Sequence, residues 1–273
     1  MKNTKKRMKQ LICFLLIGCM LFATSCAAKT NDSNDESTYE THASYELLEE
    51  VGLQVLENDN DTLSYISQKE NCEINCNKTT GEMTYTDEDG VFSLELLDVD
   101  DDGVIYWQIQ KEDEIITGEI NTSESPEAQS VLVIGGTVVT VSAILTAFIK
   151  AYAVVTIAGL TFYAVDKALD TIKRNASYYN YFPAFRMFSR VFVAATAGLS
   201  QRTAVKWIKN GWSVWASNWS YAQDACIMAS PIGVAEWGLH GSSSKGYYEH
   251  YHAVKYFEKN GRYVHTGAHC WYI

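Results

Sequence analysis

Cysteine is scarce in this chain, and several familiar catalytic motifs are missing from it. Only seven of the 273 residues are cysteine, a far smaller proportion than in a small disulfide-rich scaffold. The sequence also has no Gly-x-Ser-x-Gly motif, no phosphate-binding glycine loop and no Cys/His protease signature. These absences argue against an α/β-hydrolase, a P-loop enzyme and a cysteine protease.

Four of the cysteines lie beyond the first 26 residues, and they leave the disulfide pattern open. If the stretch "NCEINC" is a strand, Cys72 and Cys76 are too far apart along it to bond to each other. A bond between Cys226 and Cys270 is compatible with the sequence but not required by it.

The N-terminus has the arrangement of an export signal. Five Lys or Arg residues precede the apolar run "LICFLLIGCMLFA", and small residues then lead to Cys26. The end of this stretch resembles a bacterial lipobox, although Ala23 stands where leucine is preferred. We therefore expect residues 1–25 to be a signal peptide and Cys26 to carry lipid, with a plain secretory signal as the alternative. The protein would then lie at the outer face of the cell membrane or outside the cell.

Basic residues are almost absent from the part that follows. Residues 27–130 contain 27 Asp and Glu against 4 Lys and Arg, a balance of −23, whereas residues 170–273 contain 5 against 11, a balance of +6. Such asymmetry is typical of a protein with charged partners. The basic part could bind nucleic acid or an anionic membrane, or the acidic part could cover the basic part within one molecule. The alternative is that both are ordinary solvated surfaces without a charged partner.

The acidic region divides into a polar tether and a β-rich domain. Residues 26–43 hold too few large aliphatic side chains to fold, and we expect a flexible tether there. Within 44–125, alternating runs separated by "DEDG" and "DDDG" predict an antiparallel β meander. Asp98, Asp100 and Asp102 fit the start of a calcium loop. The twelfth position of that loop is an isoleucine instead of a glutamate, so we interpret the stretch as a solvated turn.

Charge is missing again from residues 131–165, where Lys150 is the only charged residue. The first 19 of these residues are uncharged and mostly apolar, roughly the minimum length for a transmembrane helix. We predict an apolar helical segment over 131–168 that contacts or spans a membrane. The alternative is a buried hairpin or a core helix.

The C-terminal part, residues 170–273, holds five of the six histidines in its last 34 residues. The sequence "GYYEHYHAV" predicts a strand, and its period of two places His250 and His252 on one face. The turn "EKNG" follows, and "RYVHTGAHCWYI" returns as a second strand. We expect a small α+β domain that ends in a β-hairpin, so the whole chain is predicted to be α+β.

The C-terminal half of the sequence contains, in this order, the apolar segment, "LSQRTAVKWIKNGWSVWA", "VAEWGLHG", "GYYEHYH" and a terminal histidine before aromatics. This series of stretches resembles a family of Gram-positive secreted toxins. The resemblance covers about residues 131–273 and includes His250, His252 and His269; His240 stands where the family has a comparable histidine. The family's final glycine is replaced by Ile273, and His265 has no counterpart, so we expect His265 to be a bystander. The resemblance implies a toxin-type role and an immunity protein as partner.

Clustered histidines on one face support two kinds of chemistry. They could bind zinc or a similar divalent metal through neutral nitrogens, with a fourth position left for water. They could also act without metal as the acid and base of RNA cleavage, with Arg262 and Lys255 holding the phosphate. The structural alternative is a pair of histidines packed among tyrosines.

We therefore expect an exported, lipid-anchored toxin-type effector whose C-terminal domain is a nuclease with His240, His250, His252 and His269 as catalytic residues. Two other functions remain open from the sequence. One is a pore-forming toxin that inserts residues 131–165 into a membrane, and the other is a non-enzymatic surface lipoprotein.

Overall fold

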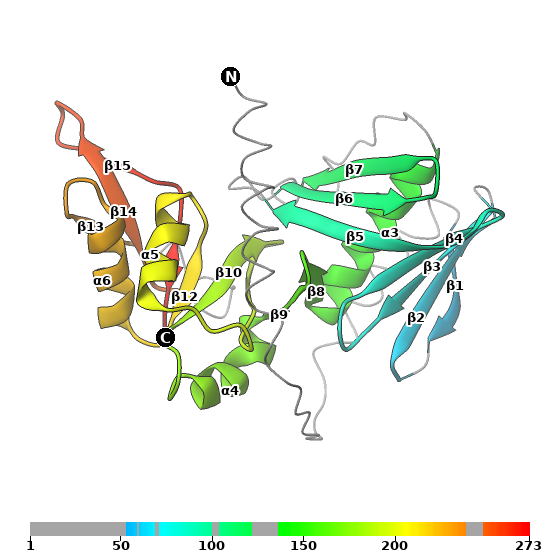
Figure 1. The fold of residues 1–273 in the computed structure, drawn as a ribbon, viewed down its shortest axis with the longest axis horizontal. Helices are drawn as coiled ribbons and strands as arrows, with labels where there is room; N and C mark the ends of the chain where they lie inside the picture. Colours follow the sequence, from blue (N-terminus) through cyan, green and yellow to red (C-terminus); the bar gives the residue numbers. More distant parts are fainter. Residues whose placement is uncertain (1–52, 59, 69–70, 100–103, 122–135, 239–247) are drawn as a thin grey trace.

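The computed structural model describes residues 53–58, 60–68, 71–99, 104–121, 136–238 and 248–273 of the chain (Figure 1). This part is a mixed α/β structure with 16 strands and four helices, and most of its regular structure is sheet. The expectation of a fold that mixes helices and strands is confirmed at this level. The division into separate domains stays a prediction.

The first seven strands form a meander in which each strand pairs antiparallel with the one before it. They are β1 (Leu53–Asn58), β2 (Thr62–Ser67), β3 (Cys72–Asn77), β4 (Met83–Asp87), β5 (Gly90–Val99), β6 (Val104–Gln110) and β7 (Ile115–Asn121). Alternation explains their burial, since Cys72, Ile74 and Cys76 of β3 face the core and the residues between them do not. Of the calcium-loop residues, Asp98 accepts a hydrogen bond from the Val99 N–H, and the other two lie outside the described residues.

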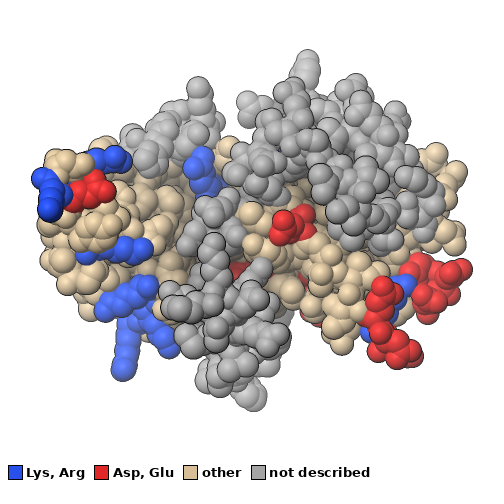
Figure 2. Space-filling model, turned by 90° about the horizontal axis from the view of Figure 1, so that it is seen from above, with Lys and Arg blue, Asp and Glu red and all other residues tan. Residues whose placement is uncertain are grey.

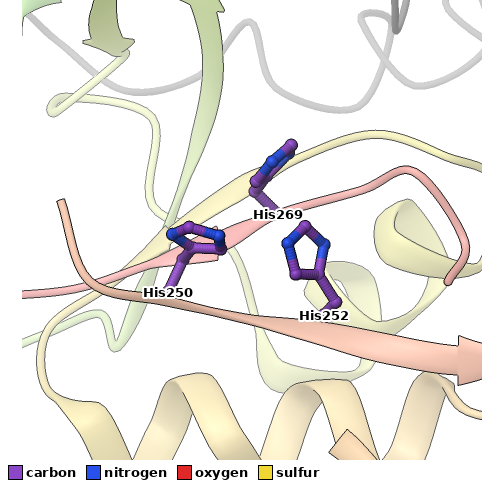
Figure 3. Close-up of side chains that lie close together, drawn as sticks. All are labelled: His250, His252 and His269. Carbon is purple, nitrogen blue, oxygen red and sulfur yellow. The ribbon is translucent and has the colours of Figure 1, made fainter. Parts of the chain in front are cut away.

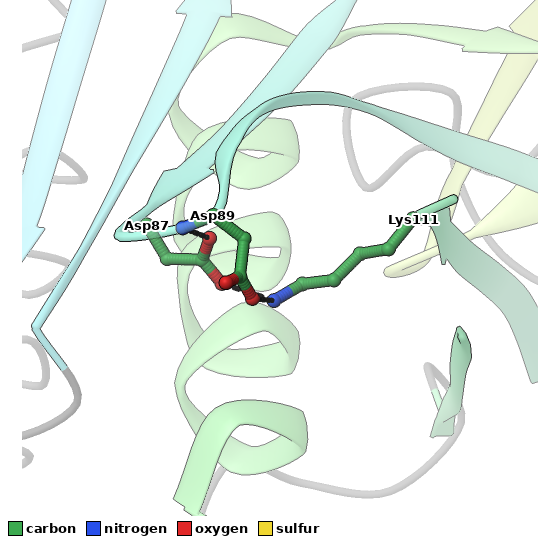
Figure 4. Close-up of polar contacts among 3 residues, drawn as sticks. All are labelled: Asp87, Asp89 and Lys111. Atoms are coloured by element: carbon green, nitrogen blue, oxygen red, sulfur yellow. Dashed lines mark hydrogen bonds and ion pairs between the residues drawn. The ribbon is translucent and has the colours of Figure 1, made fainter. Parts of the chain in front are cut away.

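Lys111 joins two turns of this acidic sheet (Figure 4). Its ammonium contacts Asp87 at 2.5 Å and Asp89 at 2.8 Å, and it lies 5.3 Å from the centre of the Phe92 ring. The Lys111 ammonium holds the pKa of the Asp87 carboxyl below its ordinary value, although burial alone would raise it. The contact ties the β4–β5 turn to the end of β6.

The apolar segment begins as α3 (Gly136–Tyr152), which packs against β3 and β7 as a core helix. Val141, Ile144, Leu145 and Phe148 are fully buried in one cluster with residues of the meander. Among the described helices, none is long and apolar enough to cross a membrane. The prediction of a transmembrane helix is therefore wrong. The predicted signal peptide and lipidated Cys26 lie outside the described residues, and no finding supports the lipoprotein assignment.

The second half of the apolar segment is a β-hairpin instead of a helix. β8 (Val154–Ile157) and β9 (Leu160–Ala164) are joined by Ala158 and Gly159, both with positive φ, as a two-residue hairpin turn requires. β8 is mostly buried, and β9 has no exposed residue, so neither strand shows the clear polar alternation that identifies a half-exposed strand. The helical prediction over 131–168 thus holds only in part, for α3 and for the helix that begins at Val165.

The remaining elements extend the sheet toward the C-terminus. They are α4 (Val165–Asn175), β10 (Tyr181–Met187), β11 (Arg190–Val193), α5 (Gln201–Lys209), β12 (Val214–Ala216), α6 (Trp219–Ala229), β13 (Ala235–Gly238), β14 (His250–Phe257), β15 (Tyr263–His265) and β16 (Cys270–Trp271). The strand order here is β9-β11-β10-β12-β16-β14-β13, with β15 also paired to β14. Ser200 and Asn218 cap α5 and α6 through their side-chain oxygens.

The two ends of the molecule carry opposite charge. Figure 2 shows Lys and Arg gathered mainly at the end formed by the C-terminal strands and helices, and Asp and Glu mainly at the end formed by the meander. The imbalance between the two halves of the sequence is therefore also a separation in space.

Candidate metal centre

Three histidines lie close together on one face of the paired strands β14 and β16 (Figure 3). His250 and His252 belong to β14, and His269 directly precedes β16. Each offers one nitrogen such that the three atoms all lie within 4.8 Å of one another. The structure thus brings together three of the four predicted catalytic histidines, while their catalytic role stays a prediction. His240 lies outside the described residues.

The register of the returning strand explains why His269 joins the pair. In the pairing of β14 with β16, Tyr251 lies opposite Cys270. Continuing that register by one residue places His269 opposite His252, and the two ring centroids are 4.4 Å apart. The chain bends between β15 and β16, where Gly267 has φ +89°.

The opposite face of the hairpin packs against α6 and fixes which way the imidazoles point. Tyr251, Ala253 and Cys270 belong to the cluster that contains the buried face of α6. Most residues of that helix face are alanine, which lets helix and sheet approach closely. Because side chains alternate along a strand, His250 and His252 stand on the side away from α6 (Figure 3).

Backbone carbonyls fix the tautomer of two of the three rings. The Nδ1 atom of His250 lies 2.9 Å from the Tyr248 carbonyl oxygen, and Nδ1 of His252 lies 3.2 Å from that of Ala268. A carbonyl oxygen can only accept, so each Nδ1 carries the proton and donates it. In a neutral ring, Nε2 is then the basic nitrogen. Metal-bound histidines commonly show this arrangement.

Neighbouring side chains hold the rings in place. The indole of Trp271 stacks on His269 with centroids 4.9 Å apart and planes within 3°. On the other side of β14, Gly238 pairs with His250. A Cβ atom at position 238 would lie 2.8 Å from Nε2 of His250, so the ring needs a glycine there.

His265 and Glu236 extend the cluster, and the sequence analysis missed both. The His265 ring stacks on His252 with centroids 4.7 Å apart, and its Nε2 contacts the Glu236 carboxylate. Both side chains are about one-third exposed, whereas His250 and His252 are buried. The structure therefore places an acid–imidazole pair at the accessible side of the centre, while the expectation that His265 is a bystander to the chemistry stays a prediction. Glu236 pairs with His252 across β13 and β14, a contact that no local spacing reveals.

The other predicted site residues are not part of the cluster. Arg262 and Lys255 are exposed on the hairpin, outside the group of three histidines. Cys226 and Cys270 are buried free thiols, and burial, followed by contact with Cys226, raises the pKa of Cys270. Cys72 and Cys76 are also free, as their common strand predicts.

The donor set fits a divalent ion of the zinc type. Three imidazoles bound tetrahedrally at roughly 2.0–2.1 Å hold their nitrogens roughly 3.3 Å apart. The three nitrogens of this chain lie within 4.8 Å of one another, so shifts of about an ångström close the set. A fourth position would remain for water or a substrate oxygen.

Comparison of the chain with protein families, curated proteins and solved structures found no match. The functional argument is therefore carried by the geometry of this site.

Proposed function

We propose that the chain is a metal-dependent nuclease whose reaction centre is formed by His250, His252 and His269. The observation that carries the proposal is the convergence of three imidazole nitrogens within 4.8 Å. The carbonyl contacts of His250 and His252 support a metal over a metal-free acid–base pair, because they favour neutral rings that present Nε2.

A nuclease suits both the centre and its surroundings. A divalent ion with three protein ligands makes bound water a nucleophile near neutral pH and stabilises charge on a phosphate oxygen. The basic balance of residues 170–273 attracts a polyanion to the end of the molecule that holds the centre. Glu236 and His265 lie where they could contact an entering substrate.

The biological role proposed with this activity is that of a toxin-type effector. Residues 170–273 would be the effector domain and residues 44–125 an acidic domain at the other end. The support is the resemblance of residues 131–273 to secreted toxins of Gram-positive bacteria. An immunity protein that covers the histidine face would be the expected partner.

The test is cleavage of RNA and of DNA by the whole chain, with and without chelator, followed by addition of zinc. We expect cleavage that the chelator abolishes, that zinc restores and that His250→Ala lacks. The matched control is His42→Ala, since His42 is the one histidine outside the C-terminal region. Cleavage that continues in the presence of the chelator but is lost in His250→Ala would indicate acid–base catalysis by histidine without a metal. Nucleic acid that stays intact in every reaction would refute the nuclease.

A further inference from the structure

Two exposed aromatic rings lie side by side at the far end of the C-terminal hairpin. Phe257 in β14 is 51% exposed and Tyr263 in β15 is 41% exposed. Their ring centroids are 4.9 Å apart with planes at 51°. Exposed aromatic rings that lie together form a small apolar patch, and contiguous apolar patches on a surface commonly mark interaction sites.

The register of the hairpin places this pair on the same face as the histidine centre. Val254 shares the face of His252 by alternation, and it pairs with His265. Two residues back along β15 is Tyr263, on that same face, and Tyr263 pairs with Phe257. The irregularity between Val254 and Tyr256 keeps the face continuous. The aromatic pair and the metal centre are thus two parts of one surface, with His265 between them.

Cations accompany the aromatic pair. Lys255, Lys259 and Arg262 are exposed in this hairpin, and Glu258 is its one acid between Lys255 and Tyr263. The turn that holds Arg262 is ordered by the Glu258 N–H, which donates to the Arg262 carbonyl at 2.8 Å. The Asn260 side chain accepts from the Arg262 N–H at 2.9 Å. Positive charge therefore lies in the same hairpin as the two rings.

We propose that this face, the histidine centre continued by Phe257 and Tyr263, binds single-stranded nucleic acid and leads the strand across His265 to the metal. The proposal deepens the nuclease function and rests on it for the cleavage step. Unpaired bases stack on exposed aromatic rings whatever their sequence, while Lys and Arg contact the phosphates. In a duplex the bases are already stacked on one another, and the two rings would have no partner.

The test is equilibrium binding by the whole chain in EDTA, so that cleavage does not intervene. The probes are a fluorescein-labelled 12-nucleotide oligo(U) and a 12-base-pair RNA duplex, followed by fluorescence anisotropy. We expect oligo(U) to bind more tightly than the duplex, and the double variant Phe257→Ser/Tyr263→Ser to bind oligo(U) at least about tenfold more weakly. The matched control is Tyr178→Ser, since Tyr178 is 81% exposed and lies outside the hairpin.

The cations are tested by the salt dependence of the same measurement. Arg262→Gln should reduce the slope of log affinity against log salt by about 0.7, the value for one contact with a single strand. Arg202→Gln, an exposed arginine of α5, should leave the slope unchanged. Tighter binding of the duplex, or a double variant that binds oligo(U) as the wild type does, would overturn the proposal.

The two proposals fail in different ways. If the double variant loses oligo(U) binding while no form of the chain cuts RNA, the binding face stands and the nuclease is refuted. If the wild type cuts RNA and the double variant binds and cuts equally well, the nuclease stands and the binding face is refuted. Metal content, measured on each variant, shows whether the serine substitutions leave the histidine centre intact.

Discussion

Gly238 of β13 lies opposite His250 of β14. Because glycine has no side chain, the His250 imidazole can occupy the space beside it. In Gly238→Ala, the new Cβ would lie 2.8 Å from Nε2 and would push the ring away from its partners. We expect zinc affinity to fall about tenfold or more, as it does when the support of a metal ligand is lost. Isothermal titration of the whole chain with zinc measures the change.

The control for this substitution is Gly159→Ala, at a turn where nothing lies within 4 Å of the new Cβ. It costs some stability, because position 159 has positive φ, but it should leave zinc affinity unchanged. Equal zinc affinity in Gly238→Ala and the wild type would show that His250 does not bind through Nε2.

Part of the site could be predicted from sequence because it follows from local geometry. Period-two alternation makes His250 and His252 neighbours in any strand that contains both. His269 entered only through the resemblance, and its register depends on the bend at Gly267. Glu236 and His265 reach the cluster through pairings between strands on opposite sides of β14. The pairing of Glu236 is set by the whole sheet and leaves no mark in residue spacing, whereas that of His265 belongs to the hairpin that the Asn-Gly turn predicts.

At the scale of elements, α3 is the part of the apolar segment that the core is built around. Phe148 is fully buried in the same cluster as Trp107 and Ile74 of the meander. We expect Phe148→Ala to lower the free energy of unfolding by about 3–5 kcal/mol, since it removes a large ring and leaves a cavity. Urea denaturation measures this, with Val91→Ala as the exposed control. A loss as small as that of the control would contradict the core position of α3.

The contact of Lys111 with Asp87 predicts a pH-dependent contribution to the free energy of unfolding, made where β4, β5 and β6 meet. The pKa of Asp87 is lowered in the folded chain, so the contact stabilises above the unfolded carboxyl pKa of about 3.9 and is lost as the pH falls through the lower folded value. Lys111→Met should cost about 1–3 kcal/mol at pH 7 and much less near pH 2. Urea denaturation at pH 7 and near pH 2 measures this loss of stability, with the exposed Lys173→Met as control. A loss of the same size at the two pH values would contradict the prediction.

The elements differ in how well the sequence indicates them. The Asp-Gly and Asn-Gly turns and the alternation of the meander are local signals, and β4, β5 and the C-terminal turn follow them. The apolar stretch from 131 to 165 carries no such signal, because a buried strand and a buried helix are both continuously apolar. Ala153, with φ +50°, separates α3 from the β8–β9 hairpin, and composition does not reveal this break.

At the scale of the whole molecule, the core of the meander extends into the middle of the chain, and two further clusters form the interior of the C-terminal part. The cluster that contains α3 and the meander also includes Met187 and Phe192 of the β10–β11 hairpin. The C-terminal part is therefore best tested within the whole chain. The charge separation also belongs to this scale: the basic end holds the histidine centre, and the acidic end would repel a bound polyanion from the rest of the molecule.

This separation predicts a salt-sensitive reaction. If nucleic acid is drawn to the basic end, cleavage at low substrate concentration should slow as salt rises from 50 to 200 mM. Initial rates on labelled RNA measure the effect, and a rate at saturating substrate that does not change serves as the control. Cleavage that is indifferent to salt at low substrate would contradict the electrostatic part of the account.

The central claim is that His250, His252 and His269 together bind one divalent metal ion. Its most direct measurement is the zinc content of the purified whole chain after dialysis, by inductively coupled plasma mass spectrometry. We predict about one zinc per chain in the wild type and in His42→Ala, and a loss of most of it in His250→Ala, His252→Ala and His269→Ala. Circular dichroism shows that each variant is folded. A folded wild type without zinc, or zinc that all three alanine variants retain, would contradict the account.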